Sequence, residues 1–81
     1  MAKTSVRHAK NPSLVALGEA IRRVRVRSEA SQEGLALAAE LDRSYVGGIE
    51  RGEVNVALVN IVKLAAALEL SVEALMKEAG L

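Results

Sequence analysis

The chain has 81 residues, of which 51% are apolar and none is cysteine. This length allows one small domain with a modest core, and the lack of cysteine excludes a disulfide framework and a thiolate metal site. The net charge of +1 argues by itself neither for nor against nucleic acid as a partner.

The charge is unevenly distributed along the chain. Residues 1–27 hold most of the Lys and Arg residues and only one acid, Glu19, and the rest of the chain is acidic. We therefore expect one basic face or arm on an otherwise acidic body. No apolar run approaches the roughly 18 residues of a membrane span, and the N-terminal segment lacks the apolar core of a secretory signal. The sequence predicts a cytoplasmic protein with no membrane partner.

The N-terminal part predicts an arm followed by a helix. Residues 1–10 are polar and show no periodicity, so we expect a flexible basic arm over 1–10 that carries Lys3, Arg7 and Lys10. A folded domain is expected over 11–81. Asn11 followed by Pro12 is typical of a helix N-cap with proline in the first helical position. Apolar residues then recur at helical spacing to about residue 27.

Four more helices are predicted downstream. Each begins after a polar residue that precedes an apolar stripe with helical spacing and can act as an N-cap; these residues are Ser31, Asp42, Asn55 and Ser71. Gly52 is expected to end the third helix. Strand signals are weak throughout, so the sequence predicts an all-α domain of five helices.

Residues 31–52, SQEGLALAAELDRSYVGGIERG, predict two short helices joined by a tight turn. Two helices that cross closely need a small residue at the crossing, and Ala36 has the right position. The second helix leaves polar and small residues on its outer face and carries the only aromatic residue, Tyr45, near its start. This pattern is typical of a helix-turn-helix whose second helix lies in the DNA major groove.

Four segments resemble the phage-repressor and Cro-type (XRE-like) helix-turn-helix family in their order and spacing. They are LGEAIRRVR, SQEGLA, LDRSYVGGIERG and NIVKLAAAL. The third is especially similar to the controller proteins of restriction–modification systems. The resemblance implies a five-helix, lambda-repressor-like DNA-binding fold over most of the chain.

The resemblance also implies roles for individual positions. Those expected to contact bases are Arg43, Ser44, Tyr45 and Gly47. Those expected to contact the DNA backbone are Ser31, Gln32, Arg51 and Asn55. Two further positions resemble a family pair that forms a semi-buried salt bridge between the first and third helices, namely Arg25 and Glu50. An arginine can donate two hydrogen bonds to O6 and N7 of guanine. For Tyr45, a packing role is the alternative.

The chain departs from the family pattern at two kinds of position. Glutamate occupies three turn positions where the family often has glycine: Glu29, Glu40 and Glu69. A positive φ at such a residue costs about 1–2 kcal/mol. Gly47 and Gly48 weaken the third helix by roughly 1 kcal/mol each relative to alanine. From these glycines we expect a close approach of the helix to DNA and base reading concentrated in its first turn.

We predict a sequence-specific DNA-binding transcriptional regulator that binds a pseudo-palindromic operator as a homodimer, because one recognition helix buries too little surface for tight, specific binding. The expected partners are double-stranded DNA, a second copy of the chain and RNA polymerase, and the protein is expected to be nucleoid-associated when bound to DNA. The arm residues Lys3, Arg7 and Lys10 are expected to add backbone or minor-groove contacts. The expected dimer contacts lie on the two C-terminal helices, at Val59, Val62, Val72, Leu75 and Met76.

The narrower hypothesis is a restriction–modification controller. The alternatives are an antitoxin, a phage-type repressor, and a protein-interaction module of the same fold that does not bind DNA. The only histidine, His8, lies in the polar N-terminal segment, and no paired acid or nucleophile constellation is recognisable. We therefore expect no enzymatic activity, no metal and no cofactor.

Overall fold

The computed structural model describes residues 10–81, which form helices and no strand. The helices are α2 (Pro12–Arg27), α3 (Gln32–Ala39), α4 (Arg43–Glu50), α5 (Leu58–Ala67) and α6 (Val72–Ala79). Five helices were expected, and the all-α prediction is confirmed for this part of the chain. The expected arm lies outside the described residues except for Lys10.

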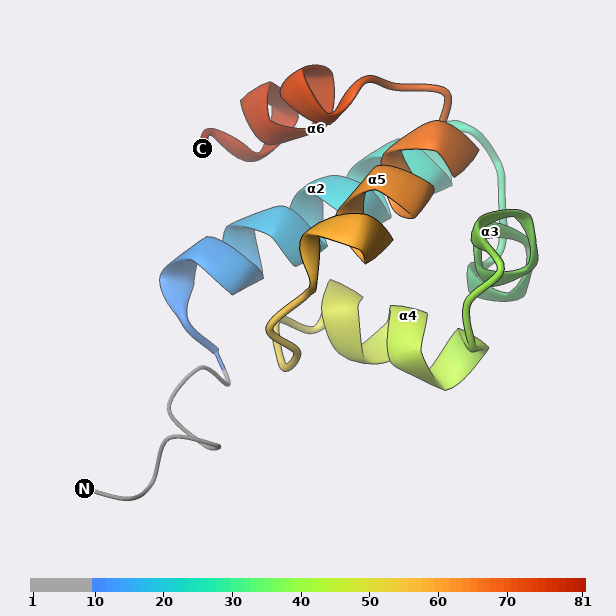
Figure 1. Cartoon of the computed structure of the whole chain (residues 1–81), viewed down its shortest axis with the longest axis horizontal. Helices are drawn as coiled ribbons and strands as arrows, with labels where there is room; N and C mark the ends of the chain where they lie inside the picture. The colour runs from blue at the N-terminus through green and yellow to red at the C-terminus, as the bar shows by residue number, and fades with distance from the viewer. Residues whose placement is uncertain (1–9) are drawn as a thin grey trace.

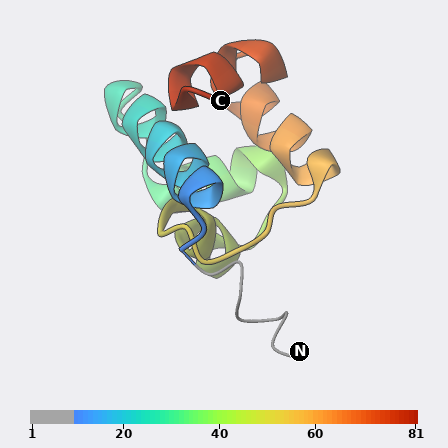
Figure 2. The same ribbon diagram turned by 90° about the vertical axis from the view of Figure 1, so that its left-hand side faces the viewer.

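The helices contact one another in a closed ring around the core. α2 packs on α4, α4 on α3, α3 on α5, α5 on α6, and α6 again on α2. In Figure 1, α6 lies at the top and α4 at the bottom, with α2 and α5 between them. Figure 2 shows the same arrangement along α2, with α4 and α6 on opposite sides. α4 is therefore held from one side only, which leaves its other side outside the ring.

The centre of the ring is apolar. The largest side chains that are almost completely buried are Ile21, Val46, Ile49, Leu64 and Leu75. Each such side chain contributes roughly 1.5–3 kcal/mol by leaving water. Because Leu75 is 0% exposed, the expectation that it forms a dimer contact is wrong. Its place on α6 turns it toward the core of its own chain.

Local capping sets most of the helix starts. The side chains of Asn11, Ser31 and Ser71 each accept a hydrogen bond from a backbone N–H of the first turn, at 2.9, 2.9 and 3.0 Å respectively. Such a bond satisfies an N–H that has no partner within the helix. These three predicted caps are confirmed. Asp42 stands at the N-cap position of α4 but makes no side-chain cap hydrogen bond.

The predicted start of α5 is wrong. The helix begins at Leu58 with Ala57 as its N-cap, and Asn55 lies in the preceding non-helical segment as an exposed residue. The physical reason lies in Val56, which is 9% exposed and belongs to the core. The chain has to bring this side chain inward before it turns into α5, and the local capping preference of Asn55 is overridden.

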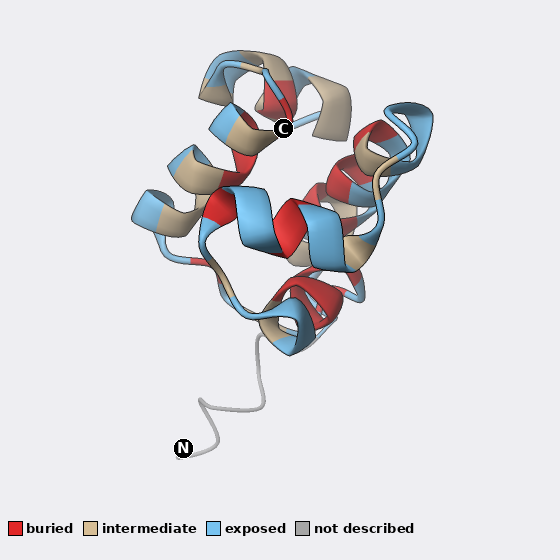
Figure 3. Cartoon of the chain, turned by 90° about the vertical axis from the view of Figure 1, so that its right-hand side faces the viewer, coloured by how far each residue is buried: buried red, intermediate tan, exposed pale blue. Residues whose placement is uncertain are grey.

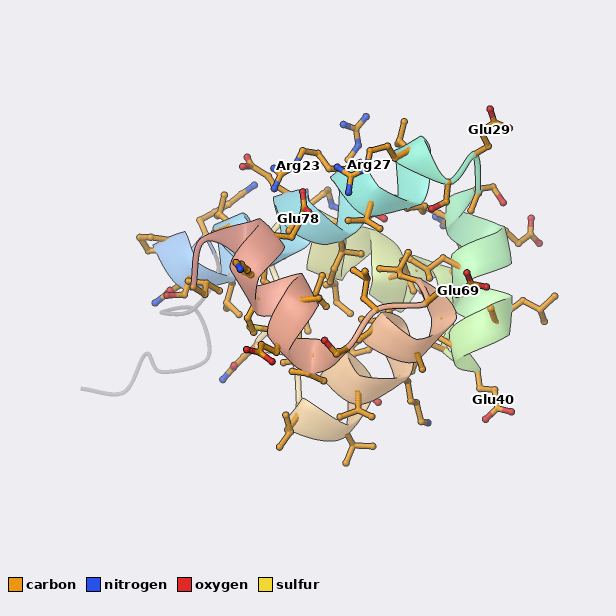
Figure 4. All side chains as sticks on the ribbon, turned by 90° about the horizontal axis from the view of Figure 1, so that it is seen from above. Arg23, Arg27, Glu29, Glu40, Glu69 and Glu78 are labelled. Atoms are coloured by element: carbon orange, nitrogen blue, oxygen red, sulfur yellow. The ribbon has the colours of Figure 1, made fainter. Side chains whose placement is uncertain are left out.

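The five helices end in the same way. In each, the N–H of the residue after a left-handed residue donates to the carbonyl five positions earlier, at 2.8–3.1 Å, which is the Schellman motif. The left-handed residues are Glu29, Glu40, Gly52, Glu69 and Gly80, with φ between 60° and 76°. The predicted strain at the three glutamates is therefore present. Figure 4 shows these three glutamates at the same end of the molecule.

Candidate DNA-binding surface

α4 divides into a buried face and an outer face. Val46, Ile49 and Glu50 are buried, whereas Arg43 and Ser44 are exposed. α3 packs against α4 through its own buried face, and Figure 3, seen from the side of α3, shows the contrast between buried and exposed turns. The outer face therefore presents a guanidinium and a hydroxyl group on a short helix fixed from behind.

A buried ion pair joins α2 to α4. Nε and Nη2 of Arg25 donate to the two carboxylate oxygens of Glu50 at 2.7 and 3.0 Å, and Nη1 donates to the carbonyl of Ala30 at 2.9 Å. Only 11% and 2% of the two side chains are exposed. The hydrogen bonds that Arg25 donates to Glu50 raise the pKa of Arg25, burial lowers it less, and the attraction to the carboxylate raises it further. Arg25 thus stays charged, and its guanidinium is engaged in hydrogen bonds inside the fold.

Gln32 connects this ion pair to the outer face. Its Nε2 donates to Oε1 of Glu50 at 2.9 Å, and its Oε1 accepts from Nη1 of Arg43 at 3.1 Å. Both ends of the amide are therefore engaged within the protein. The geometry is that of a brace between the two helices of the motif, and the phosphate contact of Gln32 stays a prediction.

Ser44, Ser31 and Tyr45 have partners within the chain. The hydroxyl of Ser44 donates to the carboxylate of Asp42 at 3.2 Å, and that of Ser31 caps α3. Tyr45 is half-buried and packs on the core, as the alternative interpretation expected. Its phenol oxygen accepts from Nδ2 of Asn60 at 2.9 Å, which leaves the O–H proton free to be donated. The expected DNA contacts of these residues stay predictions.

The two glycines of α4 are buried. A Cβ atom placed on Gly47 would stand 3.1 Å from Nη1 of Arg51, 3.5 Å from Oε1 of Gln32 and 3.7 Å from Nη1 of Arg43. Gly47 is therefore covered by long polar side chains. This cover contradicts the expectation that Gly47 itself contacts a base in this conformation.

Lys10 lies beside the C-terminal end of α4. Its backbone N–H donates to the carbonyl of Gly52 at 2.7 Å, and its Nζ donates to the carbonyl of Arg51 at 2.9 Å. The last carbonyls of a helix carry partial negative charge, which favours a cation there. The chain thus enters the domain next to the helix with the exposed Arg43, and the DNA contacts expected of the preceding basic residues stay predictions.

Two arginines of α2 lie beside an acid of α6. Arg23 and Arg27 lie close to Glu78 of α6, with N–O distances of 3.6 and 3.3 Å (Figure 4). The hydrogen bond and charge of Arg27, with a smaller effect of Arg23, lower the pKa of Glu78. α6 and α4 contact opposite sides of α2, so these charges serve the α2–α6 contact. The sequence shows how many charged residues α2 carries but not which helix their side chains face.

An exposed apolar face lies on α5. Leu58, Val59 and Val62 are 68%, 64% and 48% exposed. Val72 and Met76 of α6 are partly buried against the core. The exposed face on α5 agrees with two of the expected dimer residues and adds Leu58, which the sequence analysis missed.

Metal-ligand groups and membrane-spanning helices can be assessed for the described residues only. Residues 10–81 contain no group of three His, Asp or Glu side chains that could hold a metal ion. None of the helices in that range is long and apolar enough to cross a membrane. The hollows between α3 and α5 are lined by small and apolar residues together with four polar ones, Ser28, Glu40, Lys63 and Glu69.

Comparison with known proteins gives a family match and several similar proteins. Residues 21–75 match the family described as "Helix-turn-helix". The control protein C.BamHI of Bacillus amyloliquefaciens is 46% identical over 52 residues, which cover 63% of this chain and 64% of that protein. The crystal structure of the restriction–modification controller protein C.AhdI from Aeromonas hydrophila superposes with a TM-score of 0.75 at 53% identity, covering 76% of this chain and 94% of that one.

A solved complex is also similar. The restriction–modification controller protein C.Esp1396I, crystallised as a tetramer with its natural 35-base-pair operator, matches with a TM-score of 0.74 and 32% identity. The match covers 85% of this chain and 96% of that protein. The similarity therefore extends over nearly the whole fold of a protein that is seen bound to DNA.

Proposed function

Because the chain belongs to the helix-turn-helix family, we propose that it is a sequence-specific DNA-binding transcriptional regulator and that α4 is its recognition helix. The observation that carries the proposal is the exposed Arg43 on the outer face of a helix that Glu50 anchors from behind. A buried, hydrogen-bonded anchor fixes the helix, and a fixed helix is what base reading in the major groove requires.

The controller proteins among its relatives support a narrower function. We propose that the chain regulates a restriction–modification system, because C.BamHI, C.AhdI and C.Esp1396I are all control proteins. The relatives are regulators and not enzymes, and we propose the same for this chain. The regulator would act in the cytoplasm by occupying a promoter and excluding or recruiting RNA polymerase.

Selection from random duplex DNA with the purified full chain tests this function. We expect enrichment of a palindromic consensus whose half-sites lie about 34 Å apart or a multiple of that distance. Enrichment of no sequence above the random pool would refute the proposal. An operator that lies upstream of restriction and modification genes supports the controller function, whereas an operator upstream of a toxin gene favours an antitoxin.

The exposed apolar face of α5 supports a homodimer. We propose that the face formed by Leu58, Val59 and Val62 is covered by the same face of a second copy, because two-fold symmetry makes such a patch self-complementary. Val59→Asp should give a monomer in sedimentation velocity and weaken binding to the full palindrome. Leu37→Asp is the matched control, because Leu37 is 79% exposed on α3 and its replacement should leave the dimer intact.

Two outcomes would contradict this dimer. One is a wild-type protein that sediments as a monomer at micromolar concentration. The other is a Val59→Asp protein that stays dimeric while Leu37→Asp dissociates, which would move the interface to α3.

A further inference from the structure

Two arginines and two glycines share the outer face of α4. Successive residues of an α-helix are rotated by about 100°, which places Arg51 at the centre of this face. Arg43 and Gly47 lie on one side of it, and Ser44 and Gly48 lie on the other. Arg51 itself follows the last helical residue and keeps helical backbone angles.

Arg51 folds back along α4 toward the start of the helix. The Cβ position of Gly47 lies 3.1 Å from Nη1 of Arg51, and that of Gly48 lies 4.0 Å from its Nη2. Side chains on a helix lean toward its N-terminus, and two residues without side chains leave this path open. The guanidinium therefore lies one turn before its own Cα, next to the guanidinium of Arg43.

Neighbouring side chains hold the two guanidinium groups there. Nε of Arg51 lies 3.2 Å from the carboxylate of Glu53, and Nη1 of Arg43 donates to Gln32. Within residues 10–81 the Nη1 and Nη2 groups of Arg51 make no hydrogen bond that satisfies normal geometry, and its side chain is 58% exposed. The terminal edge of Arg51 is thus open to an acceptor outside the chain.

We propose that Gly47 and Gly48 form a seat for the guanidinium of Arg51, and that Arg51 reads a guanine beside the base pair read by Arg43. The inference rests on the DNA-binding function proposed above. It replaces the expected phosphate contact of Arg51 and extends base reading beyond the first turn of α4. Base pairs follow one another every ~3.4 Å along the duplex, so two adjacent guanidinium groups can meet neighbouring base pairs.

The chemistry favours guanine over phosphate as the partner. Phosphates flank the groove, whereas Arg51 lies at the centre of the face that would enter it. O6 and N7 of guanine accept two parallel hydrogen bonds from one guanidinium. Arg43 and Arg51 carry like charges side by side, and two adjacent guanine edges offer both of them acceptors.

Base-pair substitution in the selected operator tests the role of Arg51. For the wild-type protein we expect a strong guanine preference at two neighbouring positions of each half-site. Arg51→Ala should reduce the guanine preference about 5- to 150-fold at one of the two positions and leave it unchanged at the other. Arg51→Lys should lose most of it as well, because an ammonium lacks the planar fork. Uniform weakening on all sequences, with rescue by Arg51→Lys, would instead show a phosphate contact and overturn the inference.

Gly47→Ala tests the seat separately from the arginine. The added methyl group would push Nη1 of Arg51 aside by a few tenths of an ångström and would raise the helix propensity of α4. We expect a higher Tm together with a weaker guanine preference at the position that Arg51→Ala affects. Gly48→Ala should weaken that preference less, because its methyl would meet Nη2 of Arg51 only at 4.0 Å, although a Val54 methyl at 3.0 Å has to shift.

The failure of this inference can be told apart from the failure of the proposed function. A wild-type protein that enriches no sequence overturns both. A wild-type consensus that Arg51→Ala and Gly47→Ala leave unchanged at every position overturns the seat and the base contact alone.

Discussion

Replacing Glu40 by glycine should stabilise the domain. Glu40 ends α3 with φ 60° and ψ 42°, a conformation that costs an L-residue about 1–2 kcal/mol. Glycine adopts it without that cost, but its greater freedom in the unfolded chain lowers the stability of the fold by about 0.4–1 kcal/mol. The free energy of unfolding should therefore rise by about 0.5–1 kcal/mol, which raises Tm by about 2–8 °C in a domain of this size.

Two control variants separate backbone strain from charge. Glu40→Ala removes the carboxylate but keeps a Cβ at the left-handed position, so we expect little gain in stability. Glu33→Gly makes the same exchange inside the first turn of α3, where glycine costs roughly 0.5–1 kcal/mol. The same chemical change should thus stabilise at residue 40 and destabilise at residue 33. Thermal unfolding followed by circular dichroism, at fixed protein concentration, gives the Tm of Glu40→Gly, Glu40→Ala and Glu33→Gly.

The reasoning would be refuted if Glu40→Ala stabilised as much as Glu40→Gly, because relief of repulsion between acidic groups would then be the cause. High salt makes the same distinction, since it screens exposed charges and leaves backbone strain unchanged. Glu29→Gly and Glu69→Gly should behave like Glu40→Gly, because both residues end a helix with the same left-handed geometry.

Three further predictions concern ion pairs and the N-terminal segment. Arg25→Ala leaves the buried carboxylate of Glu50 without its cation and should destabilise the fold by about 3–5 kcal/mol; lower DNA affinity with an unchanged Tm would contradict a structural role. Glu78, whose pKa is lowered by Arg27 and Arg23, should stabilise the fold above its ordinary pKa, and this contribution should be lost as the pH falls through its lowered value. Glu78→Gln should abolish that part of the acid sensitivity, and an identical pH profile of Tm would count against it. Deleting residues 1–9 should reduce the salt dependence of DNA binding, with a slope change of about 0.9 for each phosphate that the segment neutralises; an unchanged slope would exclude the segment from the interface.

The sequence by itself determined the helices and most of their starts, because these depend on nearby residues. Asn11, Ser31 and Ser71 cap the helices that follow them, and each cap needs only a side chain and an N–H two or three positions away. The helical spacing of apolar residues likewise indicated the buried faces of α2, α3 and α4. The resemblance to a known family supplied the pairing of Arg25 with Glu50, which local patterns do not contain.

The tertiary structure alone decided which apolar and charged residues share a surface. Periodicity places Val59 and Leu75 on apolar stripes alike, yet one is 64% exposed and the other 0%. It places Arg51 on the outer face of α4 but does not show its side chain folded back over Gly47. Burial and the direction of a long side chain depend on residues distant in sequence, and these come together only once all five helices close the ring around the core.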